Sequence, residues 1–229
     1  MSTPLSAQEP QRAVQPRSRP LASRVAFGFG TGIALGVALG SLAWLSDQLE
    51  YPYSALIPAN MIGAWVGLGF ILGASAKTVP TGALRGLVGL LSAVGAYYLL
   101  ISLSEAGFRL IGAPHAATTW GAVGVIAGPI FGAAGGAWRH WQGTGRALAV
   151  AVLAASLIAE GVVFGRLRTG DIGVTLLLIE IGIGLVVPFA LLRTRERLIG
   201  YVATGLLALA IGIAIEPIFV LVRSVADRF

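Results

Sequence analysis

Residues 147–165 read ALAVAVLAASLIAEGVVFG, nineteen consecutive residues in which Glu160 is the single charge. A run of this length without turn residues matches the roughly 20 apolar residues that an α-helix needs to cross a bilayer. The same pattern recurs along the chain with short polar breaks between the runs. The repeated pattern predicts an all-α, polytopic transmembrane helix bundle.

The composition agrees with a membrane protein and excludes several other classes. Only 11% of the 229 residues are charged and 56% are hydrophobic, whereas a soluble domain carries about 25% charged residues. The apolar runs also exclude disordered and fibrous proteins, and an outer-membrane barrel, whose strands alternate apolar and polar residues. The chain contains no cysteine, so disulfides and thiolate chemistry are excluded.

About seven spans are predicted, with polar or proline-containing turns between them. Their approximate bounds are 24–45, 54–75, 82–103, 117–138, 147–165, 172–192 and 198–222. Residues 1–22 are polar and proline-rich, and we expect a disordered cytoplasmic tail there, followed by a transmembrane domain over 23–225 and a short C-terminal end at 226–229.

The distribution of Lys and Arg predicts the orientation of the bundle. With seven spans and the N-terminus inside, eleven cationic residues lie on the inner side and five on the outer side. The positive-inside rule therefore favours N-inside and C-outside. Two outer cations, Arg166 and Arg168, fall in the break between the fifth and sixth spans, so six spans remain the alternative.

Glycine recurs every fourth residue in two of the predicted spans. These glycines are Gly28, Gly32, Gly36 and Gly40 in the first span and Gly124, Gly128, Gly132 and Gly136 in the fourth. A spacing of four places each set on one helix face, where the backbone of another helix can approach closely. Either packing within the chain or homodimerisation would use such a face.

Three glutamates, Glu160, Glu180 and Glu216, lie inside apolar spans, where an ionisable group is costly and usually functional. From the helical rise, all three fall roughly 9–14 Å below the outer boundary. Asn60 reaches the same level, and Pro217 after Glu216 frees a backbone carbonyl. We expect these four side chains to form a substrate- or ion-binding site in an outward-facing acidic cavity. Further acidic and aromatic residues would surround its rim: Asp47, Glu50, Glu105, Tyr51, Tyr53, Tyr97, Tyr98 and Trp120.

A structural role for the glutamates is an equally direct interpretation. A buried glutamic acid can hydrogen-bond to a neighbouring helix, and Glu216 can pair with Arg223 on the same helical face. The sequence carries no nucleotide-binding, metalloprotease or nucleophile-elbow motif. We therefore expect no catalytic residue, no resident metal and no cofactor, and we do not expect an enzyme.

Two short patterns resemble an uncharacterised family of bacterial multi-pass membrane proteins that is common in actinobacteria. One runs through Gly128–Pro129–Ile130–Phe131–Gly132 and Trp138–Arg139 to Glu160; the other runs from Ala59–Asn60 through Trp65 to Tyr97–Tyr98. The resemblance implies a location in the bacterial plasma (inner) membrane. It implies no activity, since the family's function is unknown.

Two functions follow from these observations. The first is a small transporter, or the substrate-binding membrane component of one, that takes a proton, a cation or a small cationic solute. The second is a non-transporting accessory or structural subunit of a larger membrane complex. The expected partners are membrane lipid and either a second copy of the chain or other membrane subunits, with no nucleic acid.

Overall fold

The computed structural model describes residues 21–50, 57–104, 113–167 and 171–226. These residues form seven α-helices and one short 3-10 helix, with no strand among them. The elements are α1 (Leu21–Asp47), η1 (Pro58–Asn60), α3 (Ile62–Ala74), α4 (Val79–Leu103), α5 (Ala113–His140), α6 (Gly143–Leu167), α7 (Asp171–Leu191) and α8 (Thr194–Ala226). The predicted helix bundle is therefore confirmed. Of the predicted tail, residues 1–20 lie outside the described residues.

Six of the helices are long and apolar enough to cross a membrane, which makes the chain a multi-pass membrane protein. The second predicted span, 54–75, differs from the prediction because its helix α3 has only 13 residues. At 1.5 Å per residue such a helix is about 20 Å long, less than the roughly 30 Å of a bilayer core. The turn η1 precedes it, with Pro58 at its first position.

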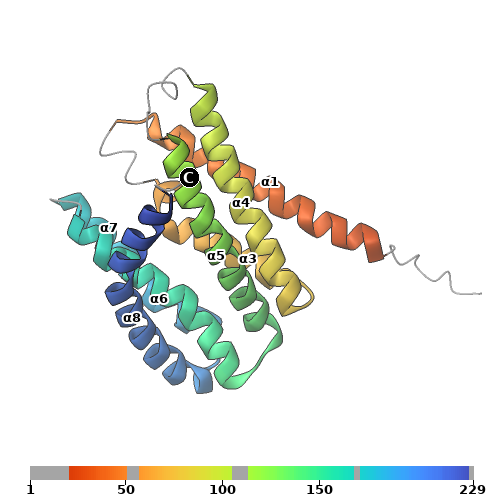
Figure 1. Cartoon of the computed structure of the whole chain (residues 1–229). Helices are drawn as coiled ribbons and strands as arrows, with labels where there is room; N and C mark the ends of the chain where they lie inside the picture. The colour runs from red at the N-terminus through yellow and green to blue at the C-terminus, as the bar shows by residue number, and fades with distance from the viewer. Residues whose placement is uncertain (1–20, 51–56, 105–112, 168–170, 227–229) are drawn as a thin grey trace, which may run out of the picture.

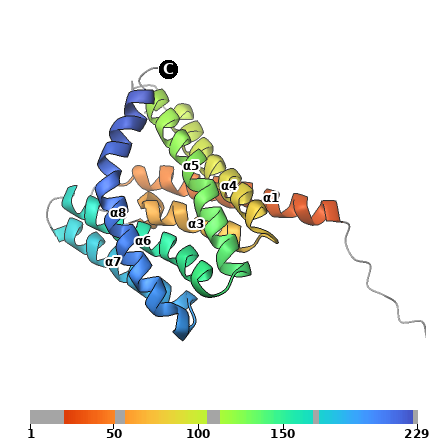
Figure 2. The same cartoon turned by 60° about the horizontal axis from the view of Figure 1, so that its bottom comes forward.

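The long helices form two groups (Figure 1). The helices α4 and α5 pack along each other, α1 lies along α4, and α3 fits between α4, α5 and α6. The second group contains α6, which packs against both α7 and α8. Figure 2 shows α8 extending along this second group toward the start of α5. The groups meet through α5 and α3 on one side and α6 on the other.

The core lies where α3, α5 and α6 meet. Its buried side chains include Val66 and Phe70 from α3, Phe131 from α5, and Leu153 and Leu157 from α6. On the outer faces of α7 and α8, large apolar side chains are exposed instead: Leu178 is 63% exposed, Leu198 75% and Leu206 65%. An apolar surface of this kind is expected where helices face lipid.

Glycine allows α1 and α5 to approach α4 closely. A Cβ on Gly36 or Gly40 would collide with the backbone carbonyls of Gly89 and Ala93 in α4, whereas a Cβ on Gly32 would meet nothing closer than 3.8 Å. Gly132 of α5 contacts the backbones of both α3 and α4, at Gly73 and Gly82. The close contacts therefore involve only part of each glycine series.

A buried arginine fills the space beside another glycine. Arg85 of α4 is 9% exposed, and a Cβ on Gly28 would overlap its guanidinium. Its Nη1 donates to the carbonyl oxygen of Ser75 at 3.0 Å and to the Ser75 hydroxyl at 3.1 Å. Arg85 thereby ties α4 to the end of α3.

The turns that follow α3, α5 and α7 lie at one end of the bundle. A ring nitrogen of His140 lies 2.9 Å from the carbonyl oxygen of Ala76, which joins the end of α5 to the α3–α4 turn. The backbone N–H of Gly143 donates to Glu196, which joins the α5–α6 turn to the start of α8. We call this the Arg-rich end, after its residues Lys77, Arg139, Arg146, Arg193, Arg195 and Arg197. The opposite end, where α1 finishes, is the Asp47 end.

Candidate functional site

A cavity of about 350 Å³ lies at the Asp47 end, between α1, η1, α3, α4 and α5. This volume is at the lower limit of the 300–1,000 Å³ that small-molecule sites usually have. Most of its wall is aliphatic or aromatic, and its polar side chains come from α1, η1 and α4. The lining residues are Ala43, Asp47, Ala59, Asn60, Ile62, Trp65, Val66, Leu90, Val94, Tyr97, Tyr98, Trp120, Val123, Gly124 and Ala127.

The acidic group of the cavity is the Asp47 carboxylate, at the last residue of α1. One oxygen accepts a hydrogen bond from the Asn60 side-chain amide at 2.9 Å, and the other accepts from the Tyr97 hydroxyl at 2.5 Å. Within the described part of the chain the single ion pair is Arg146–Glu196, at the other end of the bundle. The Asp47 carboxylate is thus oriented by two neutral donors, and its negative charge has no cationic side chain beside it among these residues.

Aromatic side chains from three helices line the same cavity as this carboxylate. Trp65 comes from α3, Tyr97 and Tyr98 from α4, and Trp120 from α5. The rings of Tyr97 and Tyr98 stand edge to face, with centroids 5.0 Å apart. The Trp65 indole N–H donates to the Ala59 carbonyl at 2.8 Å, which fixes that ring against η1. Aromatic faces attract organic cations, so the rings and the carboxylate favour the same kind of ligand.

Glu160 lies deeper and holds the beginning of α3. Its side chain is 6% exposed, and its two carboxylate oxygens accept from the backbone N–H groups of Ile62 at 2.5 Å and Gly63 at 2.6 Å. The residue before α3, Met61, provides no side-chain cap of its own. The first N–H groups of a helix have no partner within the helix, and Glu160 of α6 supplies that partner here.

Of the four predicted site residues, the structure places only Asn60 in the lining of this cavity. Glu160 caps α3 instead. Glu180 of α7 is 5% exposed and packs against α6, where a Cβ on Gly161 would lie 3.1 Å from its Cβ. Glu216 belongs to α8, but its side chain lies outside the described residues. Glu160 and Glu180 thus do not line the cavity that contains Asn60.

The cavity uses residues that the sequence places at its rim, namely Asp47, Tyr97, Tyr98 and Trp120. Trp65 also lines the cavity, but the sequence did not lead us to expect it among the site or rim residues. It follows Asn60 by five residues, and the irregular turn η1 before α3 brings both to the same cavity. The sequence signal for this arrangement is the pair Pro58 and Asn60 at the start of the second predicted span, because these residues interrupt the helix there.

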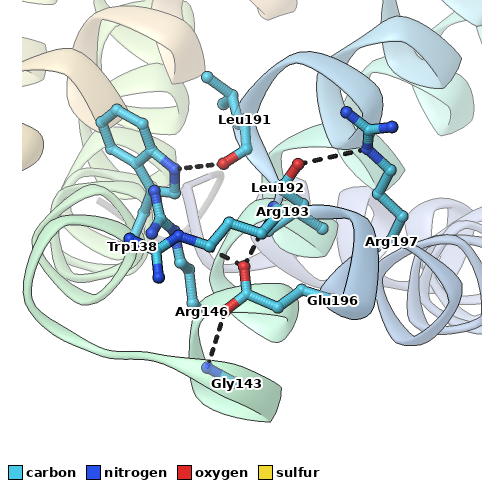
Figure 3. Close-up of polar contacts among 8 residues, drawn as sticks. All are labelled: Trp138, Gly143, Arg146, Leu191, Leu192, Arg193, Glu196 and Arg197. Carbon is cyan, nitrogen blue, oxygen red and sulfur yellow. Dashed lines mark hydrogen bonds and ion pairs between the residues drawn. The ribbon is translucent and has the colours of Figure 1, made fainter.

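A second buried glutamate organises the Arg-rich end (Figure 3). Glu196 is 7% exposed and accepts from the backbone N–H groups of Gly143 at 2.8 Å and Arg193 at 3.2 Å. It therefore caps α6. At the start of α8 it makes the glutamate half of a capping box, because the residue before the helix is Arg193 and its backbone N–H is the donor. The Arg146 guanidinium lies 4.0 Å from the same carboxylate and 5.7 Å from the centroid of Trp138, whose indole N–H donates to Leu191.

No three His, Asp or Glu side chains in the described ranges are grouped closely enough to hold a metal ion. The chemistry that the cavity offers is therefore that of one carboxylate, one amide, phenol and indole groups, and an apolar wall.

Together, the fold and the cavity define a polytopic helical membrane protein with a small cavity, lined by aromatic side chains and one acid, at one end of the described bundle. The chain belongs to a family of unknown function, DUF6518, whose sequence profile matches residues 17–219. No curated protein and no solved structure gives a significant match. The prediction of an uncharacterised family is confirmed, and the family supplies no activity.

Proposed function

We propose that this protein is a small transporter, or the substrate-binding membrane component of one, that takes a small organic cation into the cavity at the Asp47 end. One observation carries the proposal: the Asp47 carboxylate, held by Asn60 and Tyr97, lines a mostly apolar cavity of about 350 Å³ to which four aromatic side chains contribute. The proposal narrows the proton, cation or cationic solute expected from the sequence to an ammonium compound with apolar substituents.

The chemistry of the wall supports this ligand class over the alternatives. Trp and Tyr faces attract a cation and also contact its methyl or methylene groups, so a substituted ammonium gains from both. A calcium ion would need six to eight oxygen ligands, whereas the lining contains one carboxylate and one amide side chain. An anion would be repelled by Asp47. An alkylammonium group is the cation that suits a mostly apolar wall with one acid.

The orientation predicted from the cation count supports uptake from outside. Six Lys and Arg residues mark the Arg-rich end, and the positive-inside rule places that end in the cytoplasm. The cavity then opens outward in a bacterial plasma membrane, the location that the family resemblance implies. A topology reporter fused after Phe229 should give a periplasmic signal; a cytoplasmic signal would reverse the direction proposed here.

Ligand-dependent thermal stabilisation of the purified protein tests the proposal. The probes are choline, tetramethylammonium, sodium ion and 3,3-dimethylbutan-1-ol, the neutral isostere of choline. A ligand that binds the folded state raises the melting temperature with increasing concentration. We expect choline and tetramethylammonium to stabilise the protein, with no effect of sodium or the neutral alcohol.

Two variants provide the matched comparison. Asp47→Asn keeps the size of the side chain but removes its charge: its oxygen can still accept from Asn60, and its amide can donate to the Tyr97 hydroxyl oxygen in place of the present bond. Affinity for the cations should fall by about tenfold or more, equivalent to about 1.4 kcal/mol. Glu50→Gln removes the same charge from an exposed residue three positions later that does not line the cavity, and should bind as the wild type does. Absence of stabilisation by every cation, with co-purification of fixed membrane partners, would overturn the proposal in favour of an accessory subunit.

A further inference from the structure

Glu160 connects the second helix group to the wall of the cavity. It belongs to α6, which packs against α7 and α8, yet its carboxylate binds two backbone N–H groups of α3, about one hundred residues earlier in the chain. Glu160 is 6% exposed, and its two partners at the start of α3, Ile62 and Gly63, are half-buried. This contact uses none of the atoms that form the Asp47–Asn60 and Asp47–Tyr97 hydrogen bonds of the cavity.

The residues on either side of this contact line the cavity. Ile62 donates its N–H to Glu160 and also forms part of the cavity wall. Asn60, two residues earlier, donates to Asp47, and Trp65, three residues later, contributes an aromatic face. The position of the first turn of α3 therefore sets the position of three lining residues at once.

The contact is specific for a carboxylate with this reach. Two oxygens accept from two adjacent N–H groups, and the negative charge lies at the positive end of the α3 dipole. A glutamine side chain has one acceptor oxygen and an amide whose hydrogens would face the second N–H. Gly63 allows the close approach, because a Cβ there would lie 2.5 Å from a methyl carbon of Leu157 in α6.

We propose that Glu160 is a positioning residue that couples the group α6–α8 to the cavity. While its carboxylate holds Ile62 and Gly63, α3 keeps Asn60 on Asp47 and the cavity retains its shape. A shift of α6 relative to α5 is transmitted through Glu160 to α3, and it changes the cavity. The coupling to a ligand rests on the proposed function, whereas the positioning of α3 does not.

Labelling of an engineered cysteine measures the positioning directly, because the natural chain contains no cysteine. Met61→Cys places a thiol at the half-buried residue before α3. The rate at which this thiol reacts with N-ethylmaleimide is measured in three full-length proteins. The first carries Met61→Cys alone, the second adds Glu160→Asp, and the third adds Glu160→Gln. Ser102→Cys, an exposed residue near the end of α4, reports any general loosening.

We expect Glu160→Gln to accelerate labelling of Met61→Cys by about tenfold or more, which corresponds to about 1.4 kcal/mol in the opening equilibrium. Glu160→Asp keeps the charge but shortens the reach by one methylene, and should give an intermediate rate. Labelling of Ser102→Cys should not change. Equal labelling rates at Met61→Cys in all three backgrounds would overturn the positioning role, and the intermediate variant keeps this test available if Glu160→Gln does not fold.

Cation affinity measures the coupling. Glu160→Gln should weaken tetramethylammonium binding by about tenfold, again about 1.4 kcal/mol, although Glu160 is not in the cavity lining. Glu196→Gln, which removes a similarly buried two-oxygen cap at the Arg-rich end, should leave affinity unchanged. Bound tetramethylammonium should also slow labelling of Met61→Cys.

Equal affinity in Glu160→Gln and the wild type would overturn the coupling but not the positioning of α3. A wild type that binds no cation would overturn the proposed function. In that case the labelling rates still decide whether Glu160 positions α3.

Discussion

Glu160 and Glu196 are both buried glutamates that accept two backbone N–H groups, yet they are connected to the molecule in different ways. Glu196 caps helices that begin beside it, at Gly143 and Arg193, and has Arg146 at 4.0 Å. Its backbone partners belong to exposed residues at the end of the bundle. Glu160 reaches from α6 to α3, where its two N–H partners belong to the half-buried residues Ile62 and Gly63.

The difference shows what a buried acid in an apolar helix means. Where water is near, a cap is one of several ways to satisfy the first N–H groups of a helix; in the apolar interior there is no such substitute. A glutamate that accepts two backbone N–H groups therefore stabilises exposed helix starts at the Arg-rich end, whereas at Glu160 it holds the start of α3 between packed helices. A glutamate at membrane depth indicates a structural or functional constraint, and only its partners tell which.

The largest expected effect contrasts the two caps directly. Glu160→Ala leaves the N–H groups of Ile62 and Gly63 without this partner, and both residues are half-buried between packed helices, so the free energy of unfolding should fall by about 2–4 kcal/mol. Glu196→Ala should cost about 1 kcal/mol, because water reaches Gly143 and Arg193. Denaturation of both purified variants in the same detergent measures the difference. Equal losses would mean that burial of the partners does not distinguish the two caps.

A second pair of substitutions acts on the glycines at the same two places. Gly63→Val inserts a branched side chain against Leu157 and should destabilise the protein by about 2 kcal/mol through overpacking. Gly143 has φ +60°, with open space around its Cα. Gly143→Ala should therefore cost about 1 kcal/mol, from backbone strain alone. Thermal unfolding of the two variants beside the wild type checks the order, and a larger loss for Gly143→Ala would reverse the argument.

The smallest expected effect is loss of the ion pair at the Arg-rich end. Arg146→Met keeps much of the packing against Trp138 but removes the charge that lies 4.0 Å from Glu196. Near the end of the bundle such pairs contribute about 0–1 kcal/mol, so we expect a loss within that range while both backbone caps persist. Unfolding at low and high salt measures it. A loss above about 2 kcal/mol would show that the ion pair, rather than the caps, holds α6 and α8 together.

The sequence predicted the long helices well, because an apolar run of about 20 residues allows few other structures. It overestimated the helix in the second span, since hydropathy alone does not register that Pro58 and Asn60 form a separate turn before α3. The glycine series likewise indicated which faces come close, but not which positions touch. A Cβ on Gly36 would collide with the backbone of α4, whereas a Cβ on Gly32, one turn away on the same face, would make only ordinary contacts at 3.8 Å. That distinction depends on the crossing angle of two helices, which periodicity does not contain.

The apolar runs alone determined that this chain is a helical membrane protein, because burial of backbone polar groups in lipid leaves the helix as the one structure such runs can adopt. The sequence also placed Asp47, Asn60, Tyr97, Tyr98 and Trp120 near one end, by counting residues along each helix. Which of the acids meet was decided by tertiary structure only. Equal depth puts Glu160 and Asn60 at one level, but the rotation of α6 about its axis turns Glu160 toward the N-terminus of α3, while Asn60 turns toward Asp47. Depth follows from the helical rise of one helix, whereas a contact between two side chains depends on how both helices are rotated and packed.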